Sequence, residues 1–160
     1  MRRHTTLRTT SRSSELPTAA RDAWRVVASG STGEQWYVDA APLVFRGGVD
    51  RLLGGEGRRW PPPGTPILTT GDTAGFWRVT ESDPGQRRLV LEADVRAPGR
   101  VDLTTTVTPA GRGRCQVSQT ISFEPSGWLG SAYLIADLPA REVVAELVHR
   151  RLLADLSQDG

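Results

Sequence analysis

Residues 88–123 read RLVLEADVRAPGRVDLTTTVTPAGRGRCQVSQTISF, and the pattern of this stretch decides the fold. Apolar and polar side chains alternate over 88–96, 101–108 and 115–123, as they do in strands with one buried face. Short segments that contain Pro and Gly separate the three, and such turns join antiparallel neighbours. We therefore predict three consecutive strands of an antiparallel sheet.

Further strands and two helices are predicted before this stretch. Strand-like alternation recurs in three shorter segments, at 5–13, 67–70 and 76–82. A helix is expected to follow Thr18 as its N-cap and to end at Gly30, and a second helix is expected over 40–53. On the first strand, Thr9 and Ser11 are expected to face inward.

A long amphipathic helix is predicted over 141–156, after a short helical segment at 127–136. Its apolar stripe consists of Val144, Leu147, Val148, Leu152 and Leu156. Such a stripe must be buried, and the inner face of a curved antiparallel sheet is the partner that the element order offers. We therefore predict an α+β fold in which the sheet wraps around this last helix.

Length and composition are those of one ordinary domain. The chain has 160 residues, 38% of them hydrophobic and 24% charged, so we expect a single domain over 1–160 with mobile tails at 1–3 and 157–160. No segment is apolar enough for a membrane span or a signal peptide. The single cysteine, Cys115, suits a reducing compartment. We expect a cytoplasmic protein with no membrane insertion.

The charge pattern argues against nucleic acid as a partner. All 20 basic residues are arginine and 18 acidic residues are scattered among them, so the chain presents no basic stripe. Two distant histidines and one cysteine lack the spacing of a metal site, and no phosphate-binding loop occurs. We expect neither a metal nor another cofactor.

Several motifs resemble a bacterial subfamily of the START-like or SRPBCC superfamily, in the same order along the chain. They are GEQWY at 33–37, RGGVDRLLGG at 46–55, FWRV at 76–79, RAPG at 96–99 and FEPSG at 123–127. The resemblance implies a helix-grip fold, with two smaller helices after the first strand and a cavity between the sheet and the C-terminal helix. Similar domains occur alone or behind nicotinamide-dependent reductase domains, so a reductase partner is also implied, and the oligomeric state stays open.

A pocket between the sheet and the last helix is the predicted binding site, because a few polar groups among apolar walls are typical of small-molecule sites. Gln119 is its most informative member, since an amide within an apolar strand face needs partners. A structural hydrogen bond and a ligand contact both explain it, and we expect cavity waters or a ligand. The predicted ligand-binding residues are Trp36, Tyr37, Arg46, Trp77, Leu91, Leu103, Thr105, Val117, Gln119, Tyr133 and Val144.

Two functions fit this pocket, and a third lies outside it. The first is non-catalytic binding of a small hydrophobic or aromatic molecule. The second is a cyclase, dehydratase or isomerase that acts on a polyketide-like substrate, with Gln119, Tyr133 and Asp72 orienting it and moving protons. The third is a regulatory module that contacts a partner protein through Trp128 and the last helix.

The expected positions of acids and bases favour binding over catalysis. No histidine or carboxylate is expected on an inward strand face, and Val148 and Leu152 are better placed than His149 to face the core. Cys115 is predicted to be a small buried hydrophobe rather than a nucleophile. Asp72, which follows a glycine, is predicted to form a turn.

Overall fold

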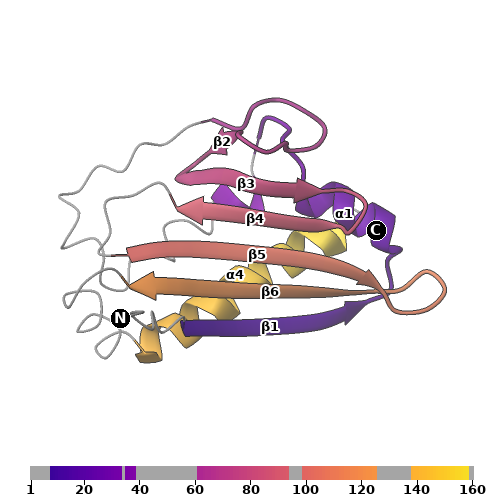
Figure 1. Cartoon of the computed structure of the whole chain (residues 1–160). Coiled ribbons are helices and arrows are strands. Elements are labelled where there is room, and N and C mark those ends of the chain that lie inside the picture. The colour runs from indigo at the N-terminus through magenta and orange to yellow at the C-terminus, as the bar shows by residue number, and fades with distance from the viewer. Residues whose placement is uncertain (1–7, 34, 39–60, 94–98, 126–137, 159–160) are drawn as a thin grey trace.

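The computed structural model describes residues 8–33, 35–38, 61–93, 99–125 and 138–158. They form an antiparallel sheet with helices on one face (Figure 1). The strands are β1 (Arg8–Leu16), β2 (Thr73–Ala74), β3 (Trp77–Asp83), β4 (Arg88–Ala93), β5 (Gly99–Pro109) and β6 (Cys115–Pro125), and the helices are α1 (Ala20–Val27) and α4 (Leu138–Gln158). The helices predicted at 40–53 and 127–136 lie outside the described residues.

The α+β helix-grip fold is confirmed. The strands follow the order β1-β6-β5-β4-β3-β2 across the sheet, and α4 lies across one face, packed against β1, β6 and α1 (Figure 1). The turn between β5 and β6 requires glycine, since Gly111 and Gly113 have φ angles of 116° and 66°. The alternation predicted for these strands is also confirmed, because Leu103, Val107 and Val117 are at most 1% exposed.

The segment 67–70, predicted to be a strand, is not one. The Leu68 N–H donates to the Ala28 carbonyl at 2.7 Å, and the Leu68 carbonyl accepts from Ser82 Oγ at 2.7 Å. The Leu68 backbone is therefore hydrogen-bonded to the residue after α1 and to a side chain of β3, and it needs no partner strand. The strand that pairs with β3 at this edge is β2, at Thr73–Ala74.

The first two elements differ from prediction in detail. β1 occupies Arg8–Leu16 and so extends beyond the predicted end at Ser13, whereas residues 5–7 lie outside the described residues. The N-cap of α1 is Ala19, without a side-chain hydrogen bond, so the predicted Thr18 cap is wrong. Tertiary packing stabilises the helix instead, as is usual for one this short. Its buried face consists of Ala20, Ala23, Trp24 and Val27.

The inward face of β1 is the opposite of the predicted one. Thr10 pairs with Ile121 of β6, and paired residues point to the same side of a sheet. Thr10 is 4% exposed, whereas Thr9 and Ser11 are exposed. Every second residue from Thr10 onward therefore faces the helices.

The buried face of α4 also differs from the predicted stripe. It consists of Ala145, Val148, His149, Leu152 and Leu156. Leu147, predicted to be buried, is 38% exposed, because it follows Ala145 by two residues, which is more than half a helical turn. His149 occupies the inner face instead.

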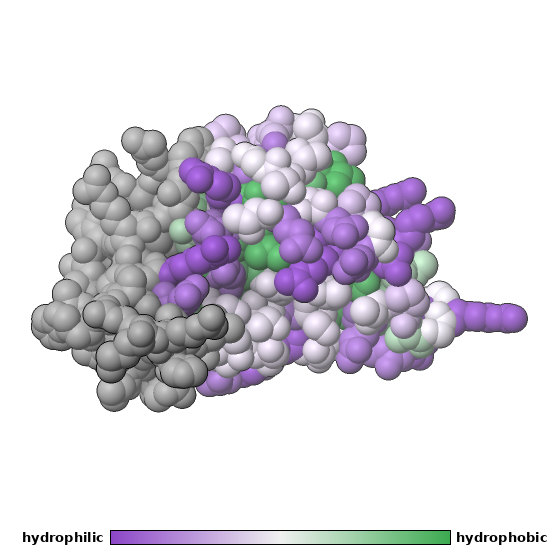
Figure 2. Space-filling model, viewed as in Figure 1, coloured by the Kyte–Doolittle hydropathy of each residue, from purple (hydrophilic) through white to green (hydrophobic). Residues whose placement is uncertain are grey.

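The outer face of the sheet, which Figure 2 shows, carries mostly polar side chains. Hydroxyl pairs link β1 to β6 on this face: Ser11 Oγ lies 2.8 Å from Thr120 Oγ1, and Ser13 Oγ lies 2.8 Å from Ser118 Oγ. The apolar core accordingly lies on the other side, between the sheet and the helices.

Candidate functional site

A chain of four hydrogen-bonded polar side chains crosses the core between the sheet and α4. Gln119 Nε2 donates to Thr105 Oγ1 at 3.2 Å, and Gln119 Oε1 lies 3.1 Å from His149 Nδ1. The other ring nitrogen, His149 Nε2, lies 2.8 Å from Ser14 Oγ. Thr105, Gln119 and His149 are at most 4% exposed, and Ser14 is half-buried. We call these four residues the polar chain.

The hydrogen-bond directions in the polar chain follow from Gln119. Its amide nitrogen faces Thr105, so its oxygen faces His149. An amide oxygen only accepts, hence Nδ1 of His149 carries a hydrogen. In the neutral ring Nε2 is then an acceptor, and the Ser14 hydroxyl donates to it.

The surroundings of His149 keep its imidazole neutral at neutral pH. Burial lowers the pKa of His149 below its ordinary value, because a buried imidazolium loses its hydration. The negative charge of Glu146 opposes this shift, and the positive charge of Arg12 adds to it. The net pKa is lowered, so a basic nitrogen is available inside the protein.

Ion pairs between β1 and α4 flank the polar chain. Thr10 Oγ1 donates to Glu142 Oε1 at 3.0 Å. Arg12 contacts Glu142 through Nη2 at 2.8 Å and Glu146 through Nε at 3.0 Å. With Ser14, alternate residues of β1 therefore contact successive turns of α4, since two strand residues and one helical turn have similar lengths.

The structure corrects two expectations about the polar chain. The Gln119 amide has protein partners, Thr105 and His149, where cavity waters or a ligand were expected. His149 faces the core rather than away from it. A signal for its position was present in the sequence, since His149 lies four residues after Ala145 and three before Leu152. Ser14 is not among the predicted site residues because it lies on the face of β1 opposite to the one expected to point inward.

The three described aromatic residues of the predicted site use their polar groups to bind backbone. Trp36 Nε1 donates to the Val27 carbonyl at 3.0 Å, and the Tyr37 hydroxyl donates to the Ser29 carbonyl at 2.7 Å. Trp77 Nε1 donates to the Tyr37 carbonyl at 2.8 Å. The first of these bonds satisfies a carbonyl at the C-terminal end of α1. All three aromatics are at most 1% exposed, so they fix the end of α1 against β3.

Other predicted site residues form the apolar wall next to the polar chain. Leu91 pairs with Leu103 across β4 and β5, and both are 1% exposed. Val117 on β6 is fully buried, and Val144 of α4 is partly buried against the same core. The remaining two, Arg46 and Tyr133, lie outside the described residues.

Three further titratable side chains, those of Cys115, Tyr37 and Asp72, have structural roles. Burial raises the pKa of the Cys115 thiol, and Cys115 is fully buried, as predicted for a small hydrophobe. Burial also raises the pKa of Tyr37, with a smaller contribution from the charge of Asp72. Asp72 Oδ2 accepts from the Thr69 N–H at 2.8 Å, which confirms that it forms a turn.

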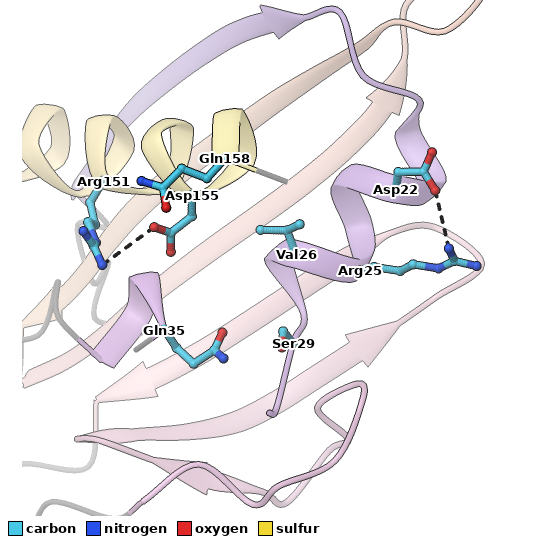
Figure 3. A pocket seen from close by; sticks show the side chains of 8 residues that line it. All are labelled: Asp22, Arg25, Val26, Ser29, Gln35, Arg151, Asp155 and Gln158. Carbon is cyan, nitrogen blue, oxygen red and sulfur yellow. Dashed lines mark ion pairs between the residues drawn. The ribbon is translucent and has the colours of Figure 1, made fainter. Parts of the chain in front are cut away.

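A pocket of about 590 Å³ lies near the C-terminal end of α4, between that helix and α1 (Figure 3). Its walls are mostly polar and include an Arg25–Asp22 pair at 3.5 Å and an Arg151–Asp155 pair at 3.7 Å. It is lined by Asp22, Arg25, Val26, Ser29, Gln35, Arg151, Asp155 and Gln158. None of these residues belongs to the polar chain, and none is a predicted ligand-binding residue.

The described part of the chain holds no group of three His, Cys, Asp or Glu side chains that could bind a metal ion. No helix within the described ranges is both long and apolar enough to span a membrane.

Comparison with solved structures agrees with the observed fold. Truncated norcoclaurine synthase from Thalictrum flavum superposes with a TM-score of 0.53 at 14% identity, covering 90% of this chain and 92% of that chain. A point mutant of that enzyme from the same plant gives a TM-score of 0.50 at 14% identity, covering 93% and 98%. The chain thus has the helix-grip fold that its motifs implied.

Sequence comparison adds the family. No curated protein sequence matches the chain. A family model does match, over residues 6–148, which end at Val148 of α4. Since this is most of the sequence, the chain belongs to the family described as "Protein of unknown function (DUF2867)".

Proposed function

We propose that this protein binds a small apolar or aromatic molecule between the sheet and α4. The observation that carries the proposal is an apolar inner sheet face, with Leu91 and Leu103, that has buried hydrogen-bonding groups at its centre. Apolar walls with a few convergent polar groups are typical of small-molecule sites. Thr105 and Gln119 would orient the molecule.

The polar chain keeps some hydrogen-bonding capacity for such a molecule. The Gln119 amide nitrogen carries two hydrogens, of which Thr105 accepts one. The Thr105 hydroxyl that accepts this bond also carries a hydrogen of its own. A ligand carbonyl or hydroxyl would suit these groups, and this defines the expected class as small, largely apolar compounds with one oxygen function.

A fluorescence titration with 1-anilinonaphthalene-8-sulfonate tests the binding proposal. Leu103→Trp enlarges a buried side chain of the inner face and is expected to weaken binding of the dye about tenfold or more. Thr104→Trp is the matched control, since Thr104 is the next residue of β5 and points to the outer face. Near-ultraviolet circular dichroism verifies that both variants keep tertiary packing. Equal affinity in the two variants, or no binding by the folded parent, would contradict the proposal.

An enzyme of the cyclase, dehydratase or isomerase type is the second candidate, and the position of His149 favours it. The sequence offered no inward-facing base, whereas His149 lies on the inner face with a lowered pKa. A neutral imidazole of this kind accepts a proton in general base catalysis. Deuterium exchange at the α-carbon of a 1,3-diketone, followed by NMR, tests this candidate. His149→Gln should abolish the exchange and leave dye binding intact.

A further inference from the structure

We propose that Ser14 is a nucleophilic serine activated by His149, and that its substrates are esters or thioesters of small carboxylic acids. In this assignment His149 is the general base and Gln119 is a positioning residue. The activity would add to the proposed binding function, and it depends on the polar chain rather than on the identity of a bound molecule.

The geometry of the polar chain meets the requirements of an activated nucleophile. Such a site needs a nucleophile and a base within hydrogen-bond reach, with the base oriented by a third group. Ser14 Oγ lies 2.8 Å from Nε2 of His149, and Nδ1 lies 3.1 Å from the Gln119 amide oxygen. The third group is itself held by Thr105, at 3.2 Å. The arrangement is therefore a serine–histidine–amide relay.

Solvent exposure increases along the polar chain from Gln119 and His149 to Ser14, the residue that would meet a substrate. Gln119 and His149 are each 4% exposed, which protects the base and its positioning residue from water. Ser14 is half-buried and belongs to β1, an edge strand of the sheet. Ser14 is therefore the least buried member of the relay and lies at the edge of the sheet.

Charged groups around His149 suit a base that gains a proton during the reaction. Glu146 of α4 faces the ring and stabilises an imidazolium, while Arg12 of β1 opposes it. Glu142 pairs with Arg12 and reduces that opposition. From β5 and β6 the polar chain receives only the uncharged side chains of Thr105 and Gln119. Because an amide stabilises an imidazolium less than a carboxylate does, slow acyl transfer is expected.

The proposed reaction proceeds in two balanced steps. Ser14 Oγ attacks the carbonyl carbon while its proton passes to His149 Nε2. The tetrahedral intermediate expels the alcohol or thiol group, which takes that proton, and an acyl-Ser14 ester remains. Water then attacks the acyl carbon and gives a proton to Nε2, and collapse returns this proton to Ser14 Oγ as the carboxylic acid leaves.

Covalent labelling with an alkyl fluorophosphonate tests the nucleophile, since a serine oxygen displaces fluoride from phosphorus. Intact mass spectrometry of the full chain is expected to show one label, and peptide analysis to place it on Ser14. Ser14→Ala should abolish the labelling. Ser13→Ala is the matched control, because Ser13 precedes Ser14 on β1 but points outward and pairs with Ser118. Its labelling rate should equal that of the parent.

Two further variants separate a reacting relay from a merely structural one. His149→Gln is expected to slow labelling about 100-fold, the usual effect of losing a general base. Gln119→Glu places a carboxylate beside Nδ1, which raises the pKa of the imidazole. The midpoint of the pH–rate profile should then move to higher pH and the plateau rate should increase. A structural role predicts neither change.

The proposal is overturned if the folded parent takes up no label on Ser14. It is also overturned if the Ser14 labelling rate is unchanged in His149→Gln. Either result is compatible with dye binding, so failure of the nucleophile and failure of the proposed binding function are distinguishable.

Discussion

Individual polar residues in the core of this protein depend on partners far away in the sequence. Gln119 and Thr105 are 14 residues apart, whereas Ser14 and His149 are 135 residues apart. A buried polar group is costly unless it is hydrogen-bonded, so each member of the polar chain constrains the position of the next. The hydrogen bonds of the polar chain thus fix the position of α4 relative to the strands of the sheet.

Replacing Gln119 tests this dependence at the level of one residue. Gln119→Leu leaves Nδ1–H of His149 without its acceptor and is expected to lower the free energy of unfolding by about 1–3 kcal/mol. Gln116→Leu, on the exposed outer face of the same strand, should change it by no more than about 0.5 kcal/mol. Urea denaturation measures both. Equal stability of the two variants would show that the amide is not needed by the scaffold.

The buried imidazole predicts a specific pH dependence of stability. The pKa of His149 is lowered in the folded protein, whereas in the unfolded chain it has its ordinary value near 6.5. Between these values the unfolded state binds more protons, so stability falls as the pH falls. The contribution is complete above about pH 6.5 and is lost toward the folded-state pKa, with a slope of at most about 1.4 kcal/mol per pH unit.

The measurement is urea denaturation at a series of pH values between about 5 and 8, with His149→Gln as the comparison. The variant should lack this slope because glutamine does not titrate. An identical slope in parent and variant would assign the pH dependence to other groups.

At the scale of elements, α4 is positioned by side chains of two kinds. Its apolar residues Val148 and Leu152 are at most 1% exposed against the sheet and α1. Along one flank, Glu142 and Glu146 contact Arg12 of the edge strand β1. The apolar contacts supply most of the stabilisation, because partly exposed ion pairs contribute little. The ion pairs instead set which residues of β1 and α4 lie opposite each other.

Two leucine variants test which face of α4 is buried. Leu152→Ala removes a fully buried side chain and should cost about 2–5 kcal/mol. Leu147→Ala removes a side chain that is 38% exposed, and it should cost less than about 1 kcal/mol. The midpoint of thermal or urea unfolding measures both effects. Similar large losses in both variants would restore the stripe predicted from sequence, which contains both leucines.

At the scale of the whole molecule, the first strand and the last described helix pack together. β1, near the N-terminus, pairs with β6 and packs against α4, the last element (Figure 1). Most of the buried apolar residues of the sheet, α1 and α4 form one cluster. Neither β1 nor α4 can therefore detach without exposing part of the shared core.

This arrangement predicts that the described elements unfold together. The fluorescence of the five tryptophans includes that of Trp24, Trp36 and Trp77, which are buried in the core around α1 and β3. Far-ultraviolet circular dichroism reports on the sheet and α4 at the same time. The two signals should give the same urea midpoint, as expected for one cooperative unit. Separate midpoints would show that the chain contains more than one folding unit.

The sequence by itself determined the elements whose two faces differ in hydropathy. In β5 and β6 the alternation is unambiguous, and the inward positions of Leu103 and Val117 followed directly from it. The resemblance of several motifs to the START-like or SRPBCC superfamily then predicted the helix-grip fold. The buried role of Cys115 and the turn at Asp72 were also readable, since each depends on its own strand or on its nearest neighbours.

Only the tertiary structure decided the features that depend on distant partners. Both faces of β1 are mostly polar, and the face without arginine was expected to point inward. Pairing with β6 turns the face that carries Thr10, Arg12 and Ser14 inward instead. Leu68 fits a strand by composition, but its backbone is bonded to α1 and β3. His149 could be buried only because Gln119 and Ser14 satisfy both of its nitrogens. The physical reason is common to all three: the free energy of burying a polar group depends on partners that local sequence does not contain.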